Sequence, residues 1–461
     1  MPLSQATRTH PWPLRLLCAL CTLWAACDEP APHTRAELTD LAETAHLNDT
    51  PDDTPDATPA PPPFDLDRLF AEDAPVWHFE LRIDDADLTW LNANAAAEHY
   101  VPGDLRFQSW DFPDVGVRYK GAYGSLHGCL APDGALLCSK LSIAINFGKY
   151  TKNQRFFGTK KLLLHGCQRD RTCLREPVSY ALFNAAGITT ARTAHATLAI
   201  NDAPPMLYVL VEAIDADFLR HRFPDPTGNL YKEVWPDSLD PNRYLDGLKT
   251  NTETPKVDRF VAFAEVVLGS TPAGAHALDP WIQRPAMATY NALDQLIHNW
   301  DGIYKFYCHG QTCRNHNYFI YDDPRTQRFV VIPWDLDHTW NLPDADFARA
   351  WWDDAPDACA ITPLPDFPAA GVRAPQCDPL LGTLMRGDWE DYRAALAQLL
   401  DGEDTRLEAV LTRLDGARAR IRPHIAVDPS APPLPQWDAA TAQLRQIIRA
   451  QYGAAAAFLA E

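Results

Sequence analysis

The chain has 461 residues, of which 46% are hydrophobic and 10% aromatic, so it can bury a large core as one big domain or two smaller ones. Its formal net charge of −20 argues against a general nucleic-acid-binding protein, because the phosphate backbone would repel it. Part of that charge lies in a polar segment near the N-terminus, so the composition still permits a local basic pocket for a nucleotide.

A signal peptide is predicted at residues 1–27. Arg8 and Arg15 precede an apolar run over residues 16–26, which is too short to span a bilayer as a permanent helix. The run ends in the sequence LWAAC, which resembles a bacterial lipobox with Cys27 as the lipidated residue. The chain is therefore expected to be exported.

The fate of the N-terminus depends on that lipobox. Trp24 stands where a smaller residue is commoner, so cleavage at an ordinary signal-peptidase site is the alternative. We expect a bacterial lipoprotein of the periplasm or cell surface, attached to a membrane only through its lipid, or a secreted protein if the lipobox is not used. Residues 28–66 are rich in Pro, Thr, Asp and Ala and have no apolar period, which predicts a disordered tether.

The eight cysteines after Cys27 fall into four pairs that are close in sequence. Many connectivities are formally allowed, and we predict the sequence-local one. Zinc is the alternative, but this part of the chain has no Cys-x-x-Cys and no clear Cys/His ligand set. Four disulfides would indicate an oxidising compartment. The predicted pairs are Cys129/Cys138, Cys167/Cys173, Cys308/Cys313 and Cys359/Cys377.

The first part of the mature chain is predicted to be rich in strands. Residues 77–83 alternate as a strand, and residues 84–97 follow as a helix whose start carries acids that suit the helix dipole. A strand at 115–120 runs into a small-residue turn from Gly121 to Ser125. Backbone N–H groups of such a turn could cover phosphates, although hairpin geometry alone would also explain the glycines.

Residues 139–147 provide the candidate phosphate-binding lysine. Their apolar side chains would share one face of a strand, so Lys140 would lie on the other face among small residues that leave room for a nucleotide. A strand lysine contacts the α- and β-phosphates in protein kinases. The alternative is a solvated surface lysine. Lys149 lies on the apolar face and Lys120 at a turn, so both are poorer candidates.

A strand at 156–164 and then a helix are predicted next. Pro177 is tolerated only in a first turn, so this helix should begin close to Glu176. Glu176 would either pair with Lys140, as the helix acid does in kinases, or serve only as an acid favoured by the helix dipole.

The remaining pattern is a hairpin that ends at Glu212, and then mostly helices. The predicted hairpins are 193–200 with 206–211, and 318–321 with 328–332. The predicted helices are 257–268, 281–298, 389–400, 406–421 and 439–459.

The stretch from Tyr290 to Trp340 concentrates oxygen ligands. An isolated Asp301 follows the helix, Asn317 precedes the second hairpin, and Asp335 and Asp337 come directly after it. Such hard oxygen donors suit Mg²⁺ or Mn²⁺ rather than zinc, and Mg²⁺ usually arrives with a phosphate. The alternative is that these side chains only cap the turns of an ordinary hairpin.

Protein kinases use the same order of parts: a catalytic Asp, an Asn metal ligand, a hairpin and a second metal-binding Asp. Three motifs of this chain resemble the signature of the CotH kinase family, the spore-coat protein H type. They are Asn299-Trp300-Asp301, His316-Asn317-Tyr318 and Ile332-Pro333-Trp334-Asp335-Leu336-Asp337. The resemblance extends roughly over residues 76–425.

The resemblance implies an α+β, atypical protein-kinase-like bilobal fold. The kinase-like domain would span residues 67–425, with a strand-rich N-lobe to about residue 212, a helical C-lobe from about 213, and a helical extension at 426–461 packed on the C-lobe. The implied activity is metal-dependent transfer of phosphate from a nucleoside triphosphate such as ATP to Ser or Thr hydroxyls of a protein substrate. The implied cofactor is Mg²⁺ or Mn²⁺.

The resemblance also implies a role for each site residue. Asp301 would accept the proton of the incoming hydroxyl, and Lys140 would neutralise the phosphates. Asn317, Asp335 and Asp337 would hold the metal. Further nucleotide contacts would come from Gly121, Ser125, Glu176 and Glu212.

Two other classes of function are compatible with the same sequence. One is a catalytically inactive kinase-like surface lipoprotein that acts as an adhesin or scaffold. The other is a structural protein in which the same carboxylates bind Ca²⁺ without a nucleotide. The sequence identifies neither the protein substrate nor a source of nucleotide outside the cytoplasm.

Overall fold

The computed structural model describes residues 64–461 except 123–124, 342–358 and 365–366. The predicted signal peptide, the lipidation residue Cys27 and nearly all of the tether lie outside the described residues. Among the helices that are described, none combines the length and the apolar character needed to cross a membrane.

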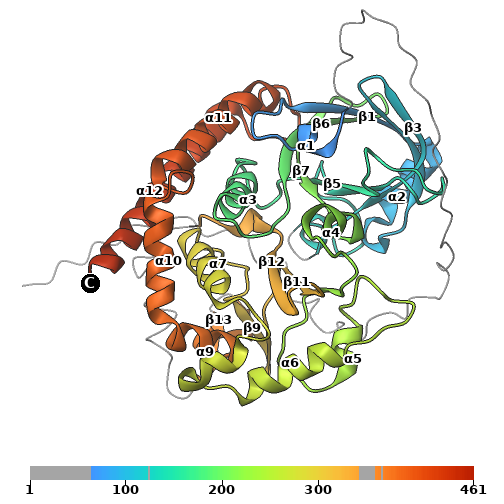
Figure 1. Ribbon diagram of the computed structural model, residues 1–461. Coiled ribbons are helices and arrows are strands. Elements are labelled where there is room, and N and C mark those ends of the chain that lie inside the picture. Colours follow the sequence, from blue (N-terminus) through green and yellow to red (C-terminus); the bar gives the residue numbers. More distant parts are fainter. Residues whose placement is uncertain (1–63, 123–124, 342–358, 365–366) are drawn as a thin grey trace, which may run out of the picture. The chain divides into compact units, whose positions relative to one another are not determined.

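Seven strands close into a barrel in the order β1-β2-β3-β4-β5-β7-β6 (Figure 1). Neighbours are antiparallel except β1 and β6, whose parallel pairing closes the barrel. Burial alternates strictly along β1 and β2, so every second side chain enters the barrel core. The strands are β1 (Trp77–Arg82), β2 (Val101–Phe107), β3 (Trp110–Tyr119), β4 (Ile143–Asn146), β5 (Lys161–His165), β6 (Thr193–Ile200) and β7 (Met206–Glu212).

The helices share a second hydrophobic core with a three-stranded sheet of order β12-β11-β8. The strands of that sheet are β8 (Leu230–Lys232), β11 (Tyr318–Asp323) and β12 (Arg328–Pro333). The helices of this part are α3 (Arg175–Ala185), α4 (Ala216–Arg222), α5 (Pro241–Leu245), α6 (Asp258–Gly269), α7 (Arg284–Leu296), α9 (Pro379–Gly387) and α10 (Trp389–Asp401).

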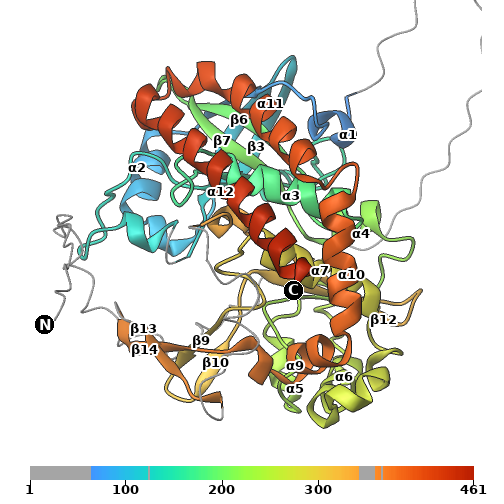
Figure 2. The ribbon, with the colours of Figure 1, turned by 90° about the vertical axis from the view of Figure 1, so that its left-hand side faces the viewer.

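Two C-terminal helices, α11 (Leu407–Ile425) and α12 (Leu434–Ala460), contact both the barrel and the helical part (Figure 2). Helix α11 packs on β7 and α3, and α12 packs on α7 and α10. The short connection between them contains Asp428, which receives hydrogen bonds from the barrel, as described below.

Most predicted elements are present, with mixed helices and strands as expected. Both predicted hairpins form, and α3, α6, α7, α10, α11 and α12 correspond to predicted helices. The expected helix at 84–97 is α2 (Asp85–Ala93) followed by one 3-10 turn. Two expected strands are shorter than predicted, because 139–147 reduces to β4 and 156–164 to β5. Sequence patterns also missed β2 and a four-stranded sheet formed by β10 (Thr312–Arg314), β9 (Phe306–His309), β14 (Phe367–Arg373) and β13 (Thr362–Leu364).

Candidate functional site

A polar pocket lies where the end of β5, the start of α3 and the turn after β12 meet. Lys120 reaches it from the end of β3, His165 is the last residue of β5, and Glu176 is in the first turn of α3. The full lining is Lys120, Gly121, Ser125, Ser142, His165, Cys167, Gln168, Asp170, Glu176, Val209, Asp335 and Asp337. Strand pairing and helix packing therefore bring together residues that are more than two hundred positions apart in sequence.

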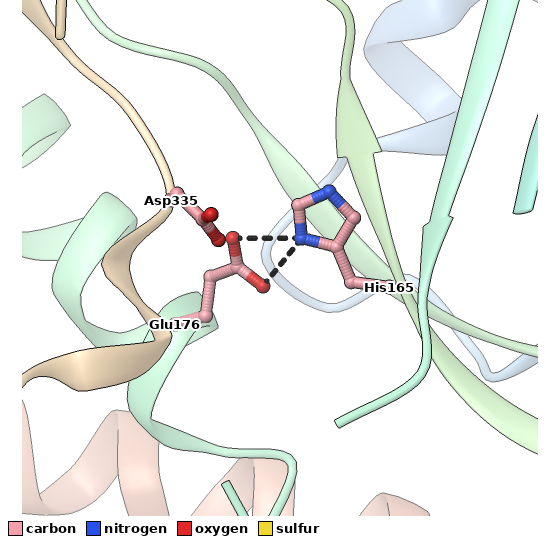
Figure 3. A group of neighbouring side chains, drawn as sticks. All are labelled: His165, Glu176 and Asp335. Carbon is pink, nitrogen blue, oxygen red and sulfur yellow. Dashed lines mark hydrogen bonds and ion pairs between the residues drawn. The ribbon is translucent and has the colours of Figure 1, made fainter. Parts of the chain in front are cut away.

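A histidine connects the lysine and the glutamate of this pocket, and Figure 3 shows its contact with Glu176. Lys120 Nζ lies 2.8 Å from His165 Nε2, and His165 Nδ1 lies 3.0 Å from each carboxylate oxygen of Glu176. An ammonium can only donate, so Nε2 accepts its hydrogen bond and Nδ1 carries the proton that is donated to Glu176. Burial, reinforced by Lys120, lowers the pKa of His165 to about 3, so the imidazole is neutral.

Negative charge gathers on the other side of this histidine. One carboxylate oxygen each from Glu176 and Asp335 and a ring nitrogen of His165 lie within 4.8 Å of one another. Burial, and next the charge of Asp335, raise the pKa values of Glu176 and Asp337 well above their ordinary range. Burial lowers the pKa of Lys120, and Asp335 and Glu176 oppose that change. Buried carboxylates that repel one another in this way fit a site for a cation.

Asp301 and Asn317 lie beside the pocket. Asn317 Nδ2 donates to Asp301 Oδ2 at 2.9 Å and to the Asp301 carbonyl at 3.0 Å. Burial raises the pKa of Asp301 to about 6, with His338 lowering it and Asp335 raising it further. Asn317 also accepts a hydrogen bond from the Trp334 N–H across the β11–β12 ladder, so it lies next to the turn that presents Asp335.

Asp335 itself has left-handed backbone geometry. Its φ is +55°, a conformation that aspartate adopts more readily than most residues. Its N–H donates to the hydroxyl of Tyr180 on α3 at 3.0 Å. The end of β12 is thereby tied to the helix that carries Glu176.

Seven of the predicted site residues are thus gathered in and beside one pocket: Gly121, Ser125, Glu176, Asp301, Asn317, Asp335 and Asp337. Lys140 and Glu212 are not among them.

The structure places the ammonium of Lys140 away from the pocket. Lys140 Nζ donates to the Leu207 carbonyl at 2.7 Å and to Asp428 Oδ2 at 3.4 Å, so it links the barrel to the α11–α12 connection. The expected position assumed a strand that begins at residue 139. Because β4 begins only at Ile143, strand alternation does not apply to Lys140. The proposed pairing of Lys140 with Glu176 is therefore not seen.

Glu212, the last residue of β7, is also occupied elsewhere. Its Oε1 accepts from Arg192 at 2.7 Å and its Oε2 accepts from Arg222 at 2.7 Å. The side chain therefore forms two ion pairs near the end of the barrel strand and is not among the residues that line the pocket.

Lys120 and His165 are the site residues that sequence reasoning missed. Lys120 follows strand β3 directly and precedes Gly121, and its position at a turn made it a poorer candidate than Lys140 by sequence pattern alone. Its N–H pairs with the Ser142 carbonyl and so continues the β3–β4 pairing by one residue, which places Lys120 beside another residue of the pocket lining. For His165, the usable signal was a polar residue ending an otherwise apolar strand, followed by glycine.

The four sequence-local disulfides are present: Cys129–Cys138, Cys167–Cys173, Cys308–Cys313 and Cys359–Cys377. Cys167 lines the pocket, and its bridge to Cys173 closes the loop that leads from His165 to Glu176. Four disulfides in one chain suggest an extracellular or otherwise oxidising compartment.

Comparison with known proteins gives one informative match. A family model described as CotH kinase protein matches residues 117–453, most of the chain. A kinase from Helicobacter pylori, CtkA, aligns with a TM-score of 0.26 and 11% identity over 66% of this chain and 92% of its own. The HipA–HipB–operator DNA complex of Shewanella oneidensis aligns with a TM-score of 0.25 and 13% identity over 81% and 71%, respectively. No curated protein matches the chain.

Proposed function

Because the chain belongs to the CotH kinase family, we propose that it is an exported, metal-dependent protein kinase that transfers phosphate from ATP to Ser or Thr hydroxyls of a protein. The observation that supports this most strongly is the convergence of Lys120, Glu176, Asp335 and Asp337 in one pocket, with Asp301 beside it. In this proposal the barrel is the N-lobe, the helical part is the C-lobe, and the pocket lies in the cleft between them.

Lys120 takes the role first expected of Lys140, which is to neutralise the α- and β-phosphates. Its ammonium lies in the pocket within 2.8 Å of His165, and Gly121 and Ser125 continue the lining from the same turn. An ammonium that faces carboxylates in a half-buried pocket is well placed to exchange them for phosphate oxygens.

The residues at the end of β12 fit a divalent cation. Asp335 and Asp337 supply carboxylate oxygens, and Asn317 lies next to them in the β11–β12 ladder. These three residues would hold the metal, which when bound supplies positive charge against the phosphates of the nucleotide.

Asp301 acts on the acceptor hydroxyl in this mechanism. The hydroxyl oxygen forms a bond to the γ-phosphorus, the bond to the β,γ-bridging oxygen breaks, ADP leaves, and the hydroxyl proton passes to Asp301. With a pKa of about 6, Asp301 is mostly ionised at neutral pH and can accept that proton. The hydrogen bond from Asn317 to Oδ2 orients the carboxylate.

Export is part of the proposal because four disulfides need an oxidising compartment. The predicted signal peptide and the lipid on Cys27 would deliver the protein to the periplasm or cell surface. The kinase would then depend on nucleotide that is available outside the cytoplasm.

The decisive experiment is mass spectrometry of the purified protein after incubation with ATP and Mn²⁺, alone and with a mixture of secreted proteins. Added phosphate on Ser or Thr, absent in Asp335→Asn, is the expected result. Metal-dependent ATP binding without any transfer would instead indicate an inactive scaffold. Thermal stabilisation by Ca²⁺ alone, with no effect of ATP, would indicate a structural calcium protein.

A further inference from the structure

The histidine beside the two carboxylates gives the pocket a mixed donor set. Figure 3 shows His165 Nδ1 facing the carboxylates of Glu176 and Asp335, and the three donor atoms lie within 4.8 Å of one another. His165 and Glu176 are 7% and 2% exposed, and each belongs to a regular element, β5 and α3. Two of the three donors are therefore held by regular elements, and the third, Asp335, lies in the turn directly after β12.

The balance of charge in the pocket calls for a cation. Among the described residues that line it, Lys120 is the only lysine or arginine, whereas Asp170, Glu176, Asp335 and Asp337 are all acids. Asp170 is satisfied by backbone N–H groups at the start of α3, which leaves three carboxylates for one ammonium. The Lys120 ammonium interacts with both Glu176 and Asp335 and contacts the imidazole, so one positive charge is shared among three acidic side chains.

We infer that His165 Nδ1, Glu176 and Asp335 form a metal site that selects Mn²⁺ over Mg²⁺. Mg²⁺ is bound almost entirely by oxygen ligands and keeps several waters, so an imidazole nitrogen adds little to its binding affinity. Transition-metal ions bind imidazole together with carboxylate oxygens, and Mn²⁺ is the one of them that shares the preference of Mg²⁺ for oxygen ligands. Asp335 is a metal ligand both in this inference and in the proposed function, and only in this respect does the inference rest on the proposed function. The inference adds a metal-binding role for His165 and Glu176.

Metal binding at Nδ1 would also change the partner of Lys120. In the metal-free protein Nε2 accepts from Lys120 and Nδ1 carries the proton. A metal ion at Nδ1 would need the lone pair of that nitrogen, so a neutral imidazole would have to carry its proton on Nε2 instead. Nε2–H can no longer accept from an ammonium.

The test uses the purified protein with Mn²⁺ and no nucleotide, so that it is independent of kinase activity. Pulsed electron paramagnetic resonance of bound Mn²⁺ should show coupling to an imidazole ¹⁴N nucleus. His165→Asn should lose this coupling and bind Mn²⁺ about tenfold or more weakly, with a smaller change for Mg²⁺. His195→Asn is the matched control, because His195 is equally buried at 7% but bonds the Cys173 carbonyl outside the pocket lining.

The outcomes separate this inference from the proposed function. Mn²⁺ that binds without nitrogen coupling, or equal affinity for Mn²⁺ and Mg²⁺, overturns the role of His165 and leaves kinase activity possible. Nitrogen coupling in a protein that never binds ATP supports the metal site and overturns the kinase. If His165→Asn does not fold, labelling histidine with ¹⁵N in the parent protein serves instead, since the coupling must change from ¹⁴N to ¹⁵N.

Discussion

Asp294, near the end of α7, should make the stability of this protein depend on pH, and one substitution should remove that dependence. Its side chain is 1% exposed, Oδ1 accepts from Asn299 Nδ2 at 2.8 Å, and Oδ2 has no hydrogen-bond partner among the described residues. Burial raises the pKa of Asp294 to about 7, with the bond from Asn299 opposing it. Asn299 lies two residues before Asp301, so this carboxyl supports the segment that carries the proposed proton acceptor.

The direction in which stability changes with pH follows from the pKa values of Asp294 in the folded and the unfolded chain. In the unfolded chain Asp294 has its ordinary pKa of 3.8. Between 3.8 and 7 the unfolded chain loses the proton while the folded protein keeps it, so the free energy of unfolding falls as pH rises through this window. Above the folded pKa both states are ionised and the effect is constant. At about 1.4 kcal/mol per pH unit, the loss from pH 5 to pH 7 is roughly 2–3 kcal/mol.

Asp294→Asn keeps the size of the side chain and removes the titration. At pH 5 the variant should be less stable than the parent by about 1–3 kcal/mol, because one amide donor takes the place of the unpartnered oxygen. By pH 8 it should equal or exceed the parent. Urea unfolding at pH 5, 6, 7 and 8 measures this, with the exposed Asp85→Asn as the control for a lost surface charge. A difference between parent and variant that stays constant from pH 5 to pH 8 would refute the reasoning.

Three further predictions concern the proposed activity. Asp301→Asn should abolish phosphate transfer while metal-dependent ATP binding survives, whereas Asp335→Asn should lose both; normal ATP affinity in Asp335→Asn, measured by calorimetry, contradicts these roles. Lys120→Met should weaken ATP binding about tenfold or more, and Lys140→Met should mainly lower the melting temperature; the reverse pattern would restore the role first expected of Lys140. Replacing both cysteines of Cys308–Cys313 with Ser should weaken ATP binding more than it lowers the melting temperature, because so short a loop adds little global stability. A large melting shift with intact binding would count against that role for the bridge.

Hydrophobic periodicity and short sequence spacings predicted those elements of the fold that form between residues close in sequence. The β11–β12 hairpin and the helix before Asp301 have clear periods, so Asn317 and Asp335 could be placed on either side of a hairpin. The disulfides could also be predicted from the sequence, because each joins cysteines that are close in sequence. A family resemblance then supplied the role of each acid, which periodicity alone does not give.

The partners of buried charged side chains could not be predicted from local sequence patterns. The position of Lys140 is set by Asp428, which lies 288 residues further along the chain. Lys120 and His165 meet only after β3 and β5 have joined the same barrel through β4. The β10-β9-β14-β13 sheet likewise pairs two segments that precede residue 342 with two that follow residue 358. None of these four short segments has a clear strand pattern in the sequence.

The carboxylate of Asp428 has a mechanical consequence. It accepts hydrogen bonds from Lys140 and from the Leu207 N–H, so the turn between α11 and α12 is anchored to the barrel while both helices also pack on the helical part. A rotation of one part against the other, as in enzymes that close over their substrate, would have to break this anchor. For the kinase proposed above, this anchor should therefore oppose a domain rotation during nucleotide binding.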